Sequence, residues 1–292
     1  MSIHLQNGLL ELTLDLPGEN YTSSRFDWTG KISDVRYDGI RITTCETGDY
    51  SLVKDKGRGF YNEFGIDRTP GFSEAPMGGL YHKIGVGKLV KDEEEYDFFR
   101  SHTIRPVSMT HESDDESVRL TCSGDDAQSF AYILTKTIRL KEDGFTIQYR
   151  LENSGSKTIE TSEYCHNFLA VNDEPMGPDY ELRFDFDLNT NLAETVNPDG
   201  AVRPGDRTIT FEKGTDSQFF FSSLCPPDGV PAGWTLVNSK HGLVISEEGS
   251  FATRKINLWG WKHVISPELF YDITLAPGDT GEWSRTYSIR RV

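Results

Sequence analysis

The chain has 292 residues, of which 36% are hydrophobic and 12% aromatic, and this is enough for a sizeable core. Its 46 acidic residues outnumber its 30 basic ones, so the formal net charge is -16. A surface of this sign repels phosphate groups, which disfavours nucleic acid or an anionic membrane as a partner. No apolar run reaches the ~18–20 residues that a membrane-spanning helix needs.

The start of the chain and the cysteines bear on the compartment. The stretch "MSIHLQNGLLELTLDLPG" has no basic segment followed by an apolar one, so we expect no signal peptide. The four cysteines (Cys45, Cys122, Cys165, Cys225) form no CxxC pair, and their spacing suits no zinc site. We therefore expect reduced thiols, no metal, and a cytoplasmic protein.

The first informative stretch in chain order is an irregular one at 57–76, "GRGFYNEFGIDRTPGFSEAP". A loop of this length inside a compact domain is uncommon and is often functional. It carries the polar residues Arg58, Asn62, Glu63 and Arg68 among several glycines. Two interpretations stay open, a partly ordered surface loop and one wall of a site that recognises a polyhydroxylated ligand.

The rest of the chain alternates apolar and polar residues with the period of a β-strand. Such alternation runs through 117–123, 145–152, 181–189 and 207–213, and turn-forming residues separate the runs. The segment 135–153 predicts a hairpin that closes at Asp143-Gly144, and 127–137 reads as a strand. We expect an all-β protein with under a tenth of its residues in helix and a single antiparallel domain over residues 1–292.

The strand at 158–171, "TIETSEYCHNFLAV", is interrupted by polar residues. Period-two alternation puts Tyr164, His166 and Phe168 on one face, with Cys165 and Asn167 on the other. A histidine between aromatic residues is most often a packed, hydrogen-bonded core residue. The alternative is a catalytic histidine, and the strand alone does not decide between the two.

A second interrupted strand lies near the C-terminus, in "LWGWKHVISPELFYDITLAPGDT". Trp259 and Trp261 alternate there, and Glu268 follows a proline. Tryptophan rings pack well against the apolar face of a sugar, although they are also common core residues.

The chain resembles the galactose mutarotase-like (aldose 1-epimerase) superfamily. Three places carry the resemblance: "YCHNFLAVND", "SPELFYDITLAPGDT", and the order of an Arg/Gly-rich loop, "GGLYHKIGVGKL", a central histidine and a late glutamate. Together they span most of the chain from about Gly57 onward. The resemblance implies a large antiparallel β-supersandwich with a cleft on a concave face.

The resemblance also implies an activity, which is interconversion of the α and β anomers of a free sugar. Glu268 would be the general base at the anomeric hydroxyl, and His166 the general acid at the ring oxygen. No metal or organic cofactor is required. The expected partner is a small carbohydrate, and the protein would be a monomer or a homodimer.

The expected substrate-binding residues come from the same resemblance and from the irregular stretch. They are His82, Arg58, Asn62, Glu63, Arg68, Asn167, Trp259 and Trp261. His82 would be the family's earlier histidine, but the glycines that usually follow it are absent, so Lys83 is an alternative. The family's early-loop arginine would be Arg58 or Arg68, and the sequence does not choose between them.

Two other functions remain as alternatives to the isomerase. One is a non-catalytic carbohydrate-binding protein on the same scaffold. The discriminating feature is whether His166 and Glu268 face each other across one pocket, at a separation that leaves room for a pyranose ring. The other is a polysaccharide-degrading enzyme, which is disfavoured because the sequence contains no helical catalytic domain and no secretion signal.

Overall fold

The computed structural model describes residues 2–189 and 191–292, and this part of the chain contains 24 strands and no α-helix. All strand pairs recorded within it are antiparallel. The predicted all-β, antiparallel class is therefore confirmed.

Two large sheets form the layers of the fold. The first sheet runs in the order β1 (Ile3–Asn7), β2 (Leu10–Asp15), β3 (Lys31–Tyr37), β5 (Phe60–Phe64), β13 (Ile159–Asn167) and β23 (Tyr271–Leu275), with β4 (Ile40–Arg41) paired to β3. The large sheet runs in the order β16 (Val202–Pro204), β17 (Thr208–Phe211), β14 (Tyr180–Arg183), β19 (Val230–Asn238), β20 (Leu243–Thr253), β24 (Thr280–Arg291), β12 (Gly144–Asn153), β11 (Phe130–Lys141), β10 (Ser117–Ala127) and β9 (Ser108–Ser113).

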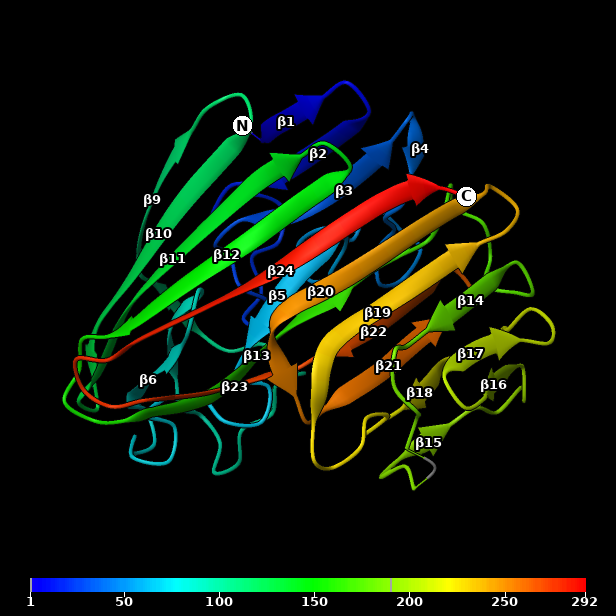
Figure 1. The fold of residues 1–292 in the computed structure, drawn as a ribbon. Coiled ribbons are helices and arrows are strands. Elements are labelled where there is room, and N and C mark those ends of the chain that lie inside the picture. The colour runs from blue at the N-terminus through cyan, green and yellow to red at the C-terminus, as the bar shows by residue number, and fades with distance from the viewer. Residues whose placement is uncertain (1, 190) are drawn as a thin grey trace.

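Two smaller sheets complete the molecule. The small sheet runs β15 (Thr195–Val196), β18 (Phe219–Phe221), β21 (Ile256–Trp261) and β22 (Val264–Leu269). A further sheet consists of β6 (Leu80–Lys83), β7 (Gly87–Val90) and β8 (Ile104–Pro106). In Figure 1 the long strands of the large sheet run side by side across the view, and the blue and cyan strands of the first sheet lie behind them.

The core lies between the first sheet and the large sheet. In β11 every second side chain from Phe130 to Leu140 is buried, which is the alternation that the sequence shows. Phe60 of β5 packs edge-on against Phe145 of β12 and Tyr287 of β24, with ring centroids 5.3 and 4.6 Å apart. Each fully buried aromatic side chain stabilises the fold by about 1.5–3 kcal/mol, so such contacts hold the layers together.

Two expectations need correction. The stretch 57–76 is not one irregular loop, because it contains β5, whose five side chains are all buried. The polar residues in that strand obscure its alternation, since Asn62 and Glu63 have buried charged partners. The predicted hairpin exists, but Lys141 pairs with Gly144, so the turn is Glu142-Asp143 and Gly144 already belongs to β12.

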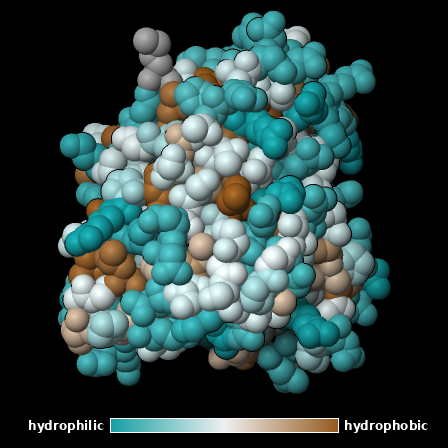
Figure 2. Space-filling model, turned by 90° about the vertical axis from the view of Figure 1, so that its left-hand side faces the viewer, coloured by the Kyte–Doolittle hydropathy of each residue, from teal (hydrophilic) through white to brown (hydrophobic). Residues whose placement is uncertain are grey.

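Figure 2 shows a face made mostly of hydrophilic and intermediate residues, with small, separated hydrophobic areas. Within the described residues, no helix has the length and apolar character that a membrane span requires.

Candidate functional site

His166 and Glu268 lie on two strands that meet between the first sheet and the small sheet. Just beyond β13, Leu169 and Ile265 exchange two backbone hydrogen bonds, with N···O distances of 3.1 and 3.0 Å. Continuing this antiparallel register by three residues along each strand puts His166 opposite Glu268. The two backbones thus meet at this bridge, and nearer the dyad the Asn167 side chain donates to the carbonyl oxygen of Pro267, so the strands are joined independently of the two ionisable side chains.

The two side chains contact each other directly, and we call them the dyad. His166 Nε2 lies 3.3 Å from Glu268 Oε1. On the other side of the ring, Nδ1 shares a hydrogen bond of 2.9 Å with Ser266 Oγ, which lies 3.4 Å from Glu268 Oε1. The backbone N–H of Asn167 donates to the same serine oxygen at 3.0 Å. Ser266 is completely buried, so its hydroxyl is fixed beside the dyad.

Burial shifts the pKa of both members of the dyad. It lowers the pKa of His166 well below the usual value, and the nearby Arg25 charge lowers it further. Burial raises the pKa of Glu268 to about 8, although Arg25 partly opposes this shift. Because the groups are in contact, they titrate as one unit. The dyad therefore holds one proton near neutral pH, and both shifts favour its location on Glu268.

The dyad lines a pocket of about 600 Å³. Tyr164 lies beside it, and Trp259 meets the His166 ring edge-on, with centroids 5.2 Å apart. The pocket wall combines aromatic and polar side chains from segments far apart in the sequence: Arg25, Glu46, Thr47, Lys56, Ile66, Phe98, Phe99, Glu194, Val196, Gln218, Phe219, Phe220, Asn257 and Trp261. Such a wall suits a ligand that has both hydroxyl groups and apolar ring faces.

Arg25 is one of several pocket residues that sequence reasoning missed, and it is the one closest in its contacts to the dyad's strand. Its Nε lies 2.9 Å from Glu63 Oε2, and its Nη2 donates to Tyr164 Oη at 3.0 Å. Tyr164 Oη in turn donates to Glu63 Oε2 at 2.7 Å. The guanidinium is thus fixed beside the pocket by a buried carboxylate. No motif surrounds Arg25, so nothing in the sequence distinguishes it from the other arginines.

The two tryptophans of the predicted substrate-binding set, Trp259 and Trp261, line this pocket. From the irregular stretch, Arg58, Asn62 and Arg68 lie elsewhere. Arg58 bonds Asp15 at 2.8 Å, Asn62 donates to Glu163 at 2.8 Å, and Arg68 pairs with Glu160 at the surface. That stretch contributes Ile66 to the pocket wall. Glu63 does not line the pocket, but it bonds two residues that do, Arg25 and Tyr164.

His82 and Asn167 are also outside the pocket. His82 is buried, and its Nε2 lies 2.9 Å from the carbonyl oxygen of Phe130. Lys83, the alternative to His82, is buried against Glu63 at 3.0 Å. Asn167 points to the core side of β13, where its Nδ2 donates to the carbonyl oxygen of Pro267 at 2.6 Å. These expected ligand contacts are therefore replaced by internal hydrogen bonds.

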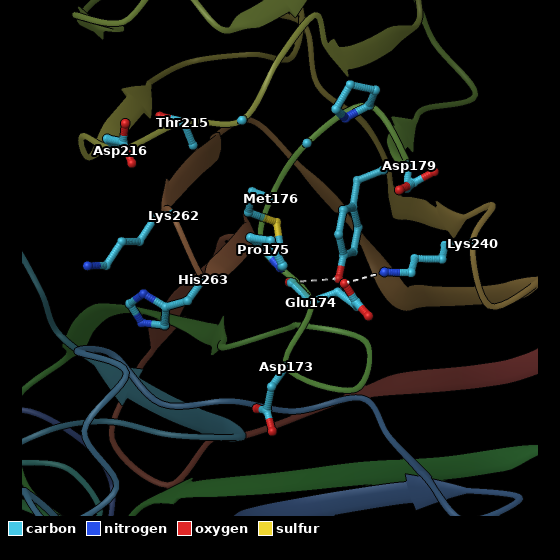
Figure 3. Close-up of a pocket in the computed structure, with 14 residues that line it drawn as sticks. Asp173, Glu174, Pro175, Met176, Asp179, Thr215, Asp216, Lys240, Lys262 and His263 are labelled. Carbon is cyan, nitrogen blue, oxygen red and sulfur yellow. Dashed lines mark hydrogen bonds and ion pairs between the residues drawn. The ribbon is translucent and has the colours of Figure 1, made fainter.

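A second pocket, of about 610 Å³, lies beside the loop that follows β13 (Figure 3). Two of its side chains already have partners within the protein, since Lys240 pairs with Glu174 at 2.7 Å and His263 Nε2 bonds the carbonyl oxygen of Cys45 at 3.0 Å. Figure 3 shows His263 and Glu174 on separate parts of the wall. The dyad pocket is therefore the better candidate site. Within the described residues, no group of three or more His, Cys, Asp or Glu side chains is placed to hold a metal ion.

Comparison with solved structures identifies the fold. A galactose mutarotase-like protein from Clostridium acetobutylicum matches with a TM-score of 0.62 and 12% identity, over 100% of this chain and 95% of that one. A galactose mutarotase-like protein from Lactobacillus casei matches with a TM-score of 0.58 and 15% identity, over 99% and 100%. The chain has the galactose mutarotase-like fold. The GalM/aldose epimerase homologue from C. elegans also matches, with a TM-score of 0.54 and 12% identity over 100% and 99%.

At the level of sequence, no family model matches the chain. No curated protein matches it either. The resemblance inferred from three short segments is thus confirmed for the fold, at identities that leave the chemistry to be argued from the site.

Proposed function

We propose that this protein is an aldose 1-epimerase-type isomerase that interconverts the α and β anomers of a sugar. The observation that carries the proposal is the His166–Glu268 dyad, in contact at 3.3 Å and lining a pocket of about 600 Å³. The names of the fold relatives, a mutarotase-like protein and an aldose epimerase homologue, support the same chemistry.

The contact between the two groups suits a hemiacetal. The anomeric hydroxyl oxygen and the ring oxygen are bonded to one carbon, so a base and an acid that reach both must also lie close together. Catalytic groups act over hydrogen-bond distances of about 2.6–3.2 Å. The sugar would therefore lie against the open side of the dyad and contact both side chains at once.

Ring opening needs one proton taken and one given. The Glu268 carboxylate takes the proton of the anomeric hydroxyl, and protonated His166 donates its proton to the ring oxygen. The bond between the anomeric carbon and the ring oxygen breaks, and a carbonyl forms. Rotation about the bond between the first two carbons, followed by the reverse proton transfers, closes the ring as the other anomer.

The shared proton makes these roles available near neutral pH. A protonated Glu268 beside a neutral His166 and an ionised Glu268 beside a protonated His166 hold the same number of protons. The first form is the favoured one, and movement of the proton from Glu268 to His166 converts it into the reactive form without exchange with solvent. For this transfer Nε2 of the neutral ring must be free of hydrogen, so Nδ1–H donates to the Ser266 hydroxyl in both forms, and that hydroxyl donates to Glu268 Oε1.

The second candidate is a carbohydrate-binding protein without catalysis. The same 3.3 Å contact favours it in one respect, because the dyad leaves no gap for a pyranose between its two members. An ion pair that served only to satisfy two buried groups would have this geometry too.

Anomer exchange measured by saturation-transfer NMR across a panel of aldoses separates the two candidates. Glu268→Gln and His166→Asn should each slow exchange by about 10²–10⁴-fold, the usual contribution of a general acid or base. Glu112→Gln and His111→Asn are matched controls, since both residues are exposed on β9. Thermal melts check folding. If both dyad variants fold and exchange sugars as fast as the parent, the binding-protein function is preferred.

A further inference from the structure

A row of side chains crosses the small sheet from the dyad to the outer edge. Residues that face each other across antiparallel strands point to the same side of the sheet. Ser266 of β22 pairs with Trp259 of β21, Trp259 with Phe220 of β18, and Phe220 with Val196 of β15. Trp259, Phe220 and Val196 all line the dyad pocket. We call these three residues the outer row.

The outer row is long and becomes more exposed away from the dyad. Three strand spacings of about 4.8 Å separate Ser266 from Val196, a span of roughly 14 Å. Trp259 and Phe220 are half-buried, and Val196 is 40% exposed. Phe99, which is 77% exposed, lines the same pocket. Exposed apolar side chains gathered at one pocket are typical of a binding surface.

The pocket is larger than one sugar ring requires. A hexose packed at the density of a protein interior occupies on the order of 200 Å³. The pocket has about 600 Å³, so a ring held at the dyad leaves most of the volume empty. The outer row is part of the wall around this volume.

The charges of the pocket wall disfavour an anionic ligand. Arg25 already pairs with Glu63 at 2.9 Å, and Lys56 lies 3.7 Å from Glu46. Glu194 adds another carboxylate to the wall. A phosphate group would compete with these internal partners, whereas neutral hydroxyl groups would not.

We propose that the outer row binds a second sugar unit, and that the preferred substrate is an uncharged reducing oligosaccharide with its reducing-end ring at the dyad. The placement of the reducing end rests on the proposed isomerase function, but the second binding site does not. The C–H faces of the second ring pack on Phe220 and Val196, as apolar sugar faces do on aromatic and aliphatic surfaces. Trp259, next to the dyad, contacts the first ring.

The experiment compares binding and exchange of reducing disaccharides with those of the monosaccharides at their reducing ends. The panel contains cellobiose, maltose and lactose against glucose, and xylobiose against xylose, with glucose 6-phosphate as the anionic probe. At least one disaccharide should bind about tenfold more tightly than its monosaccharide, the gain expected from one well-packed aromatic contact. Phe220→Ala and Val196→Ser should reduce that preference severalfold, while Met77→Ala, an exposed apolar residue outside the pocket, should not.

Each outcome decides something. The proposal is overturned if no disaccharide binds more tightly than its monosaccharide, or if both outer-row variants keep the preference. Tighter binding of glucose 6-phosphate than of glucose would contradict the proposal that the preferred ligand is uncharged. If a disaccharide is preferred and both variants lose the preference, but no sugar is exchanged, the second site stands and the isomerase function fails. Val196 is exposed enough that its variant should fold even if Phe220→Ala does not.

Discussion

Ser266→Ala tests the idea that the dyad works through its shared proton. The Ser266 hydroxyl lies 2.9 Å from His166 Nδ1 and 3.4 Å from Glu268 Oε1. When His166 is protonated, Nδ1–H needs an acceptor, and the serine oxygen is the one in contact. Alanine removes that acceptor in a buried place, so the protonated form of His166 becomes harder to reach.

The size of the effect follows from the hydrogen bond that alanine removes. A hydrogen bond to a charged group contributes about 1.5–3 kcal/mol. At 1.36 kcal/mol per factor of ten, exchange should slow by about 10–100-fold. The backbone N–H of Asn167 is also left without its acceptor, and a buried unpaired donor costs about 1–3 kcal/mol of folding free energy.

The assay separates these two effects. Anomer-exchange rates at saturating and limiting sugar should show a fall in kcat with little change in KM, because the serine touches the dyad and lies outside the pocket wall. The ¹⁵N chemical shift of His166 Nδ1 across pH should show a pKa lower than in the parent. A folded Ser266→Ala protein that exchanges sugar within threefold of the parent, with an unchanged His166 titration, would refute this reasoning.

Two further predictions concern pH and the buried charges. After correction for spontaneous mutarotation, the exchange rate should stay level through neutral pH and fall tenfold per pH unit above about pH 8, because Glu268, with its pKa raised to about 8, then loses the proton that the dyad shares. An exchange rate that keeps rising to pH 10 would contradict this prediction. Arg285→Met should lower the free energy of unfolding by about 3–5 kcal/mol, since it leaves the buried Glu163 and Glu247 without the guanidinium that bonds them at 2.7 and 2.6 Å. Denaturant titration measures this free energy. Arg183→Met is the control, because Arg183 forms an exposed ion pair and its loss should change the free energy of unfolding by under about 1 kcal/mol. An equal loss in both variants would show that burial of the pair is not the cause.

The fold could be predicted because its signal is local and repeated. Alternation in β11 and β12 appears directly in the sequence, and each strand needs only one buried face to be recognised. β5 could not be predicted in the same way. Its five side chains are all buried, and Asn62 and Glu63 are tolerated there because other strands supply their partners, Glu163 and Lys83.

The candidate site could be predicted only where a residue type suggested chemistry. The resemblance points to His166 and Glu268, and the structure brings them together through a backbone register that no local pattern encodes. Arg58 and Arg68 stand out in the sequence because they lie in a polar, glycine-rich stretch. Arg25 occupies the pocket instead, and its place depends on Glu63 and Tyr164, two residues that reach it only in the folded chain.

The residue types in β13 reflect its two faces, one on the core and one on the pocket. On the core side, Glu163 and Asn167 bond Arg285 and Glu247 of the large sheet, which fixes the strand against that sheet. On the other side, Tyr164 and His166 line the pocket. Because successive side chains of a strand alternate between faces, each pocket residue is held by a core neighbour on either side. The polar core residues that interrupt the strand pattern in "EYCHN" are thus the ones that keep its histidine in place. This is why Arg285→Met should disturb the dyad as well as the fold.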